Sequence, residues 1–234
     1  TNIIYNPVNG ENGTVQFLDN LGNIIGTMAF SNIENVIPCF TPGTMIETDR
    51  GAVAVETLEV GDLVLTLDHG LQPIRWIGKR TLSPKELARQ PKLRPVLIRA
   101  GALGPGLPAR DMRVSPQHRL LLTGAYAELI TGEAEALAPA LYYIGRPGIV
   151  QDAAAMGICY IHLMFDEHEI VHADGAWSES FQPGQASLEG LGAEQRNEIL
   201  ALFPELTCQT GPAEAYPAAR LSLKSHEARA ILAA

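Results

Sequence analysis

Residues 35–44 read NVIPCFTPGT and place Cys39 directly after Pro38. Cys39 is one of three cysteines in 234 residues. A new pattern of short strand-like runs and turns begins at the Gly-Thr pair that follows it. A cysteine in such a setting is usually a small, buried apolar residue. It becomes a nucleophile only when a neighbouring base or a lowered pKa makes the thiolate available. The partners that the rest of the sequence supplies decide between these two interpretations.

The composition is typical of a globular protein with a hydrophobic core, since 46% of the residues are hydrophobic and 18% are charged. The formal net charge of −9 argues against a nucleic acid or an anionic membrane surface as partner, because both need clustered Lys and Arg. No apolar run reaches the length of a membrane span. The chain begins with Thr1 and not with Met, so we expect it to be a piece of a longer protein.

The cysteines and histidines form no familiar metal or disulfide pattern. The three cysteines are an odd set without a C-x-x-C pair, and the six histidines include no H-E-x-x-H motif. His162, His168 and His172 lie close together in the sequence, but no second ligand cluster accompanies them. We therefore expect neither a metal ion nor another cofactor.

Short strand-like runs dominate the first two thirds of the chain. Residues 1–37 contain two of them, GTVQFLD and NIIGTMAF, separated by the hairpin signal NLGN at 20–23. From Cys39 onward, such runs alternate with turn residues at near-regular spacing, which predicts an all-β sandwich or barrel-like body. Residues 158–165, ICYIHLMF, show the strand alternation most clearly.

Helices are expected in three places. The stretch AEALAPA at 134–140 predicts one inside the β body. The C-terminal region predicts two more, in SLEGLGAEQRNEILALF with Ser187 as N-cap and in SLKSHEARAIL with Ser222 or Ser225 as cap. The fold class is thus all-β with a short helical C-terminal segment.

His118, in VSPQHRLLL, is the best partner for a reactive Cys39. Ser115 precedes it by three residues, and Pro116 fixes a turn between two strand-like runs. A loop between strands is a suitable place for a positioned imidazole. An acyl transfer from a peptide needs such a group, because the leaving amine must receive a proton.

The order of three blocks resembles the Hint domain, which hedgehog autoprocessing domains and inteins share. These blocks are CFTPGT from Cys39, VETLEVGDLVLTLD from Val55 with its Gly-Asp-x-Val strand, and VSPQH ending at His118. A late block, CYIHL with HADG further on, matches more loosely. The resemblance covers residues 39–181 and implies a compact Hint-type fold.

A narrower resemblance is to bacterial Hint proteins at the C-termini of large secreted calcium-binding repeat proteins. FSNIENVIPCFTPGT, GLQPIRWIG, SPQHRLLL and ESFQPG fit that subgroup. It implies that residues 1–38 are the tail of an upstream passenger, 39–183 the autoprocessing domain and 184–234 a helical C-terminal segment. It also implies an extracellular location, as the C-terminal module of a larger protein.

The resemblance implies self-cleavage at the Pro38-Cys39 bond. The Cys39 thiol attacks the carbonyl carbon of Pro38 in an N-to-S acyl shift, and water or a small nucleophile then opens the thioester. His118 is the implied proton donor for the amine, and Ser115, in place of the usual Thr, helps to hold the site. The passenger is thus the substrate, and no cofactor is implied.

The late block departs from the family. Where the family often has an Asp, this chain has Ile161 or His162, so either His162 substitutes as the base or the step is slow. The alternative interpretation of His162 is an ordinary core histidine. Thr41, within the first block, and His168 are assigned supporting places, and His168 favours a structural role. Residues 175–181, GAWSESF, contain no Asn that could cyclise, so cleavage without splicing is expected.

Two other functions remain open from the sequence. The first is a cysteine peptidase acting in trans through a Cys39/His118 dyad, which would need an open cleft and a third residue to orient the imidazole. The second is a non-catalytic β module for secretion or adhesion, in which Cys39 is merely buried.

Overall fold

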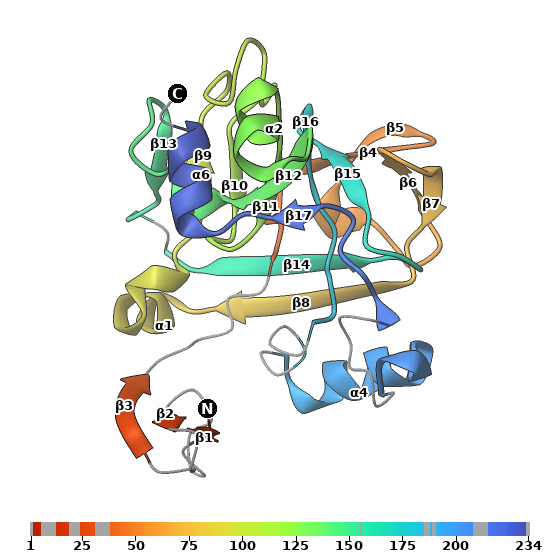
Figure 1. Ribbon diagram of the computed structural model, residues 1–234. Helices are drawn as coiled ribbons and strands as arrows, with labels where there is room; N and C mark the ends of the chain where they lie inside the picture. The colour runs from red at the N-terminus through yellow and green to blue at the C-terminus, as the bar shows by residue number, and fades with distance from the viewer. Residues whose placement is uncertain are drawn as a thin grey trace. The chain divides into compact units, whose positions relative to one another are not determined.

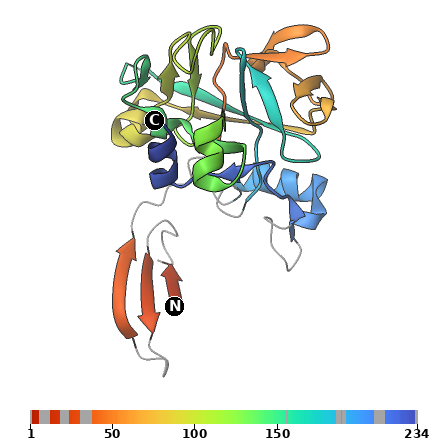
Figure 2. The same ribbon diagram turned by 45° about the horizontal axis from the view of Figure 1, so that its top comes forward.

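The computed structural model describes residues 2–5, 13–18, 24–30, 38–154, 156–184, 188, 191–207 and 215–232. The chain divides into two compact units, Thr1–Asn35 and Val36–Ala234. The first unit is an antiparallel sheet of β1 Asn2–Tyr5, β2 Gly13–Leu18 and β3 Ile24–Phe30, in that order, as Figure 2 shows. The two predicted strands are confirmed, whereas the NLGN segment lies outside the described residues.

The second unit begins with strands and ends with helices (Figure 1). Its strands are β4 Met45–Thr48, β5 Gly51–Ala54, β6 Leu63–Thr66, β7 Gly70–Pro73, β8 Trp76–Leu82, β9 Val96–Ile98, β10 Met112–Val114, β11 Arg119–Thr123, β12 Glu135–Pro139, β13 Ile149–Gln151, β14 Ile158–Met164, β15 Ile170–Ala173, β16 Ala176–Glu179 and β17 Leu221–Ser222. Its α-helices are α1 Pro84–Arg89, α2 Ala125–Thr131, α4 Ala193–Leu202 and α6 Ser225–Leu232. Short 3-10 turns are η1 Val55–Thr57, η2 Pro91–Leu93, η3 Ala140–Tyr143 and η4 Pro204–Thr207.

Three sheets organise this unit. The largest has the order β17-β12-β11-β16-β15-β4-β6-β7, with β5 paired to β4. The second is β10-β9-β13, and the third is the long antiparallel ribbon of β8 and β14. The predicted all-β fold class is therefore confirmed. Among the helices of the described residues, none has both the length and the apolar character needed to cross a membrane.

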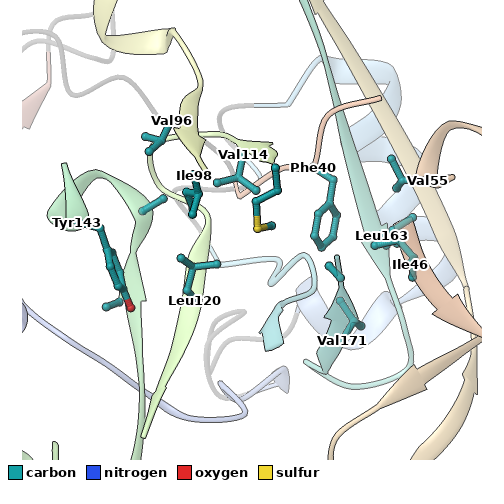
Figure 3. Packing of buried hydrophobic residues seen from close by; sticks show 14 of the residues in the cluster. Phe40, Ile46, Val55, Val96, Ile98, Val114, Leu120, Tyr143, Leu163 and Val171 are labelled. Atoms are coloured by element: carbon teal, nitrogen blue, oxygen red, sulfur yellow. The ribbon is translucent and has the colours of Figure 1, made fainter. Parts of the chain in front are cut away.

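Strand β14 separates two hydrophobic cores because its side chains alternate between two buried faces. Ile161 and Leu163 belong to the Phe40 cluster, which also contains Phe40, Ile46, Val114 and Val171 (Figure 3). Tyr160 and Met164 belong instead to the Trp76 cluster, defined here as Cys39, Trp76, Leu82, Leu87, Leu93, Tyr160, Met164, Phe181, Leu188, Ile199, Phe203, Leu206 and Tyr216. The alternation read from ICYIHLMF thus marks a strand that is buried on both sides, not a half-exposed one.

Phe40 anchors the chain between these cores immediately after Cys39. Its backbone N–H donates to the carbonyl of Ile161 at 2.9 Å and its carbonyl accepts from the N–H of Ile161 at 2.9 Å. A second bridge joins Phe40 to Val114 at the end of β10. Since the side chain is 1% exposed, burial and backbone pairing together fix the position of the preceding peptide bond.

The predicted helix at 134–140 is wrong. Residues Glu135–Pro139 form β12, which pairs with β11 on one side and runs parallel to β17 on the other. Ala136, Leu137 and Ala138 are fully buried in this position. Backbone pairing on both edges and burial outweigh the intrinsic helix preference of Ala and Leu, which is a weak local term.

The C-terminal helices lie within the predicted stretches. Helix α4 begins at Ala193, and Ser187 lies outside the described residues. Helix α6 begins at Ser225, and the Glu227 carboxylate accepts from the N–H of Lys224 at 2.7 Å. The start of α6 is therefore stabilised by a carboxylate of the first turn that accepts from the N–H of the residue just before the helix.

Candidate active site

The peptide bond between Pro38 and Cys39 is held by the VSPQH turn. The N–H of Cys39 donates to the Ser115 hydroxyl oxygen at 3.0 Å, and the N–H of Ser115 donates to the carbonyl of Cys39 at 3.0 Å. Pro38 and Cys39 are both buried, and Cys39 is 3% exposed. Ser115 is fully buried as well. The Ser115 side chain therefore faces the nitrogen of the bond that the sequence predicts to be cleaved.

His162 contacts both atoms on which acyl transfer at Cys39 depends. Its Nδ1 lies 2.8 Å from the carbonyl oxygen of Pro38, and its Nε2 lies 3.7 Å from Cys39 Sγ. Because a carbonyl oxygen can only accept, Nδ1 carries the proton in this contact. Nε2 is then the unprotonated nitrogen and faces the thiol. One neutral imidazole thus links the thiol to the carbonyl that it would attack.

Burial sets the protonation states of this site. Desolvation raises the pKa of the Cys39 thiol well above its ordinary value, against a smaller lowering by the hydrogen bond to Ser115. Desolvation also lowers the pKa of His162 to about 4. At neutral pH the pair is accordingly a thiol beside a neutral imidazole, so an attack by the sulfur would require a proton to move to Nε2.

His118 lies beside the same segment but makes a different contact. Its ring packs edge-on against Phe40, with 4.5 Å between the ring centroids. Its backbone N–H closes the turn by donating to the carbonyl of Ser115 at 3.0 Å. Neither ring nitrogen of His118 has a hydrogen-bond partner among the described residues, although the side chain is buried. Desolvation lowers its pKa to about 4.

Thr41 and His168, which the sequence assigns supporting places, make different kinds of contact. The Thr41 hydroxyl donates to the carbonyl of Arg113 at 2.9 Å and so fastens the strand that follows Cys39. His168 accepts at Nδ1 from the N–H of Ala219 at 2.9 Å, and its Nε2 faces the Glu179 carboxylate at 3.4 Å without hydrogen-bond alignment. His168 therefore ties the C-terminal segment to the β body.

Glu179 is a charged residue that the sequence reasoning missed. It is fully buried and accepts from the backbone N–H of Arg119 at 2.7 Å and from its guanidinium at 2.9 Å. Its charge also opposes the effect of burial on the pKa of His118. Glu179 opens the ESFQPG motif, but nothing in that motif signals a buried charge, since an acidic residue in a strand is usually interpreted as exposed.

Two aromatic residues complete the surroundings of His162. The indole of Trp76 lies nearly parallel to the imidazole, at 19° and 6.3 Å between centroids. The ring of Phe181 approaches His162 edge-on at 5.5 Å. Trp76 is 2% exposed and belongs to the Trp76 cluster. Within the described ranges, no group of three or more His, Cys, Asp or Glu side chains could hold a metal ion.

Acidification is expected to destabilise the fold through these two histidines. In the folded chain the pKa values of His118 and His162 are about 4, whereas in the unfolded chain both histidines titrate near 6.5. Lowering the pH from 7 to 5 should therefore reduce the free energy of unfolding by about 2 kcal/mol for each histidine. In this window the unfolded chain binds protons that the folded chain does not, so stability rises with pH. Urea unfolding at both pH values measures the difference.

A His118→Leu variant isolates one contribution. It should lose about 2 kcal/mol less than the unchanged chain between pH 7 and pH 5. Other titrating groups cancel in this comparison, including His69, whose pKa is raised by its hydrogen bond to Glu169. Equal losses in both proteins would contradict the assignment of His118 as a buried neutral imidazole.

Comparison with known proteins identifies the fold family. The family model of the Hint domain matches residues 38–185. Similar solved structures include a bacterial intein-like domain from Clostridium thermocellum, with 12% identity and a TM-score of 0.36 over 61% of this chain and 97% of that one. A DnaB intein from Synechocystis sp. PCC 6803 has 13% identity and a TM-score of 0.35, over 61% of this chain and 98% of that one. The gp41-1 intein has 13% identity and a TM-score of 0.35, over 60% and 97%.

No curated protein matches the chain. The assignment rests on the family model, which covers more than half of the sequence and includes Pro38, Cys39, Ser115, His118 and His162. The chain belongs to the Hint domain family.

Proposed function

We propose that this chain cleaves its own backbone between Pro38 and Cys39 through a thioester. Membership of the Hint family supports self-processing in general. The observation that carries the specific proposal is the bridging position of His162, 2.8 Å from the Pro38 carbonyl oxygen and 3.7 Å from Cys39 Sγ. A core histidine would need no simultaneous contact with a thiol and with the carbonyl adjacent to it.

In the first step the thiol becomes a nucleophile. The Cys39 S–H proton passes to Nε2 of His162 while the sulfur forms a bond to the carbonyl carbon of Pro38. The carbonyl electron pair moves to the oxygen, and the N–H at Nδ1 stabilises the negative charge that develops there. His162 is thus the base and the oxyanion donor in the same step. The surrounding apolar side chains strengthen both interactions by excluding water.

In the second step the C–N bond breaks. The carbonyl re-forms, the Pro38–Cys39 amide nitrogen leaves, and a proton must reach it, so that an amide and a thiol become a thioester and an amine. The Ser115 hydroxyl oxygen lies 3.0 Å from this nitrogen and holds it in position by accepting a hydrogen bond from its N–H. His118 is the proton donor in this proposal: as a neutral imidazole it gives its ring N–H proton to the amine while its other ring nitrogen takes up the proton that His162 received from the thiol, so both imidazoles end neutral. The buried ring nitrogens of His118 lack hydrogen-bond partners among the described residues, and a catalytic role is one reason for a protein to keep such a costly arrangement.

The thioester then reacts with water or a small nucleophile and releases a fragment that ends at Pro38. Residues 175–181 contain no Asn for cyclisation, so cleavage proceeds without splicing. In this proposal residues 1–38 are the tail of a passenger, and the chain is the C-terminal module of a secreted bacterial protein. The 3% exposure of Cys39 favours attack on the adjacent bond over a substrate supplied in trans.

The chain is expected to release a fragment ending at Pro38 when it is incubated with a small thiol or hydroxylamine. Intact-mass spectrometry over time identifies both products, and the larger one must begin with Cys39. Cleavage should be faster with the added nucleophile than in buffer, because the nucleophile captures the thioester. A chain that stays whole under all these conditions, or that is cut at another bond, would refute self-cleavage at this site.

A further inference from the structure

We propose that Trp76 and Glu198 form a positioning pair for His162. Helix α4, which carries Glu198, is therefore needed for full activity of the site. The family model ends at residue 185, whereas Glu198 lies beyond it. The kinetic part of this inference rests on the proposed function, but the geometric part does not. Trp76 and Glu198 are positioning residues that act through His162.

The ribbon of β8 and β14 places Trp76 beside His162. Gly78 stands directly opposite His162 in the register of the two strands, and Trp76 stands opposite Met164. The indole of Trp76 lies across Gly78, where an added Cβ would come within 2.7 Å of Cζ2 and 2.8 Å of Cζ3. Glycine at this position therefore creates the space that lets the indole reach the imidazole.

The imidazole has little room to rotate. Trp76 lies nearly parallel to it, Phe181 meets its edge at 5.5 Å, and the centroids of Trp76 and Phe181 are 5.6 Å apart. All three side chains are at most 2% exposed. A half-turn of the ring would remove Nδ1–H from the Pro38 carbonyl and Nε2 from the thiol together. Close packing of the two aromatic rings against the imidazole opposes that rotation.

Glu198 holds the indole from the C-terminal helix. The Nε1–H of Trp76 donates to Oε2 of Glu198 at 3.0 Å, which satisfies a donor that is otherwise costly to bury. Gln195, one turn earlier in α4, donates to the carbonyl of Lys79 in β8 at 3.1 Å. Figure 1 shows α4 next to the β8–β14 ribbon.

Helix α4 is fixed at this place by its own apolar residue. Ile199, next to Glu198, is fully buried in the Trp76 cluster, to which Cys39 also belongs. The exposed carboxylate of Glu198 is thereby presented to the indole from a packed helix rather than from a mobile loop. The order of contacts runs from α4 to Trp76, from Trp76 to His162, and from His162 to the scissile carbonyl and the thiol.

The test compares Trp76→Phe, Glu198→Ala and Glu198→Gln with Glu194→Ala, which removes an exposed glutamate one turn earlier in α4. Trp76→Phe and Glu198→Ala should slow hydroxylamine-induced cleavage about 10-fold or more, because positioning errors of this size carry such costs. Glu198→Gln keeps an oxygen acceptor and should recover most of the rate. Glu194→Ala should match the unchanged chain.

Nitrogen-15 NMR of the histidine rings supplies a readout that needs no cleavage. In the full chain carrying Cys39→Ala, His162 should be the Nδ1–H tautomer, and adding Trp76→Phe or Glu198→Ala should give a mixture of tautomers. An unchanged tautomer together with unchanged rates would overturn the positioning role. If the chain does not cleave at all but the tautomer shifts as expected, the proposed function fails and the positioning pair stands.

Discussion

Replacement of Cys39 by alanine is expected to abolish formation of the fragment that ends at Pro38. The proposed chemistry has no other nucleophile, so the rate should fall by more than about 1,000-fold, the scale on which removal of an attacking side chain usually acts. The side chain is small and buried, and alanine keeps most of its volume. The loss should therefore appear without loss of the fold. Intact-mass spectrometry after incubation with hydroxylamine measures the fragment, and circular dichroism checks the structure.

Cys159→Ala is the matched control. Cys159 lies on β14, on the face of the strand opposite to His162, and packs against the Phe40 cluster. Its removal should leave the cleavage rate within about twofold of the unchanged chain, since surface and peripheral changes are usually small. Fragment formation by Cys39→Ala at the original rate would exclude a thioester at this residue. Loss in both variants would instead point to a general effect of thiol removal on the fold.

Replacement of His162 by asparagine is expected to slow cleavage about 100- to 1,000-fold, the usual scale for loss of a general base. The asparagine amide N–H can still donate to the Pro38 carbonyl in place of Nδ1–H, but nothing replaces Nε2 as a base. The variant therefore separates the two roles that the geometry gives to His162. The rate is measured with saturating hydroxylamine, so that the acyl shift and not thioester capture is limiting.

The pH dependence distinguishes loss of a base from general damage. Burial lowers the pKa of His162 to about 4, so in the unchanged chain the base is already unprotonated at pH 5 and the rate should be flat from pH 5 to 8. In His162→Asn the reaction depends on the small thiolate fraction of Cys39, whose pKa burial raises. Its rate should rise about tenfold per pH unit.

His226→Asn is the control for this experiment, because His226 is exposed on α6. It should keep both the rate and the flat profile. A His162→Asn chain with a flat profile and an unchanged rate would assign His162 to the core and leave His118 as the imidazole of the reaction.

The sequence predicted those parts of the fold that local patterns encode. Alternation in ICYIHLMF predicted β14, and the run SLKSHEARAIL predicted α6. The stretch at 134–140 was misinterpreted because its Ala and Leu content favours a helix locally, whereas its backbone partners are the preceding strand β11 and the distant strand β17. Pairing between residues far apart in sequence leaves no signal in the residues themselves.

The candidate site divides in the same way. Cys39, Ser115 and His118 could be chosen from the sequence because thiol, hydroxyl and imidazole groups are few and stand in short blocks in a particular order. His162 could be named, but its role could not, since a histidine in a strand is equally suited to a core. Trp76 and Glu198 carried no chemical signal, because an indole and a helix carboxylate are common structural residues.

The sequence by itself determined the family, the all-β class and the bond at which chemistry is proposed, because these depend on residue identity and order. Only the tertiary structure decided that His162 bridges the Pro38 carbonyl and the Cys39 thiol, and that Trp76, held by Glu198, lies beside it. The physical reason is that hydrogen bonds and pKa shifts depend on distances of a few ångströms between residues more than one hundred positions apart. Burial in a packed core sets those distances.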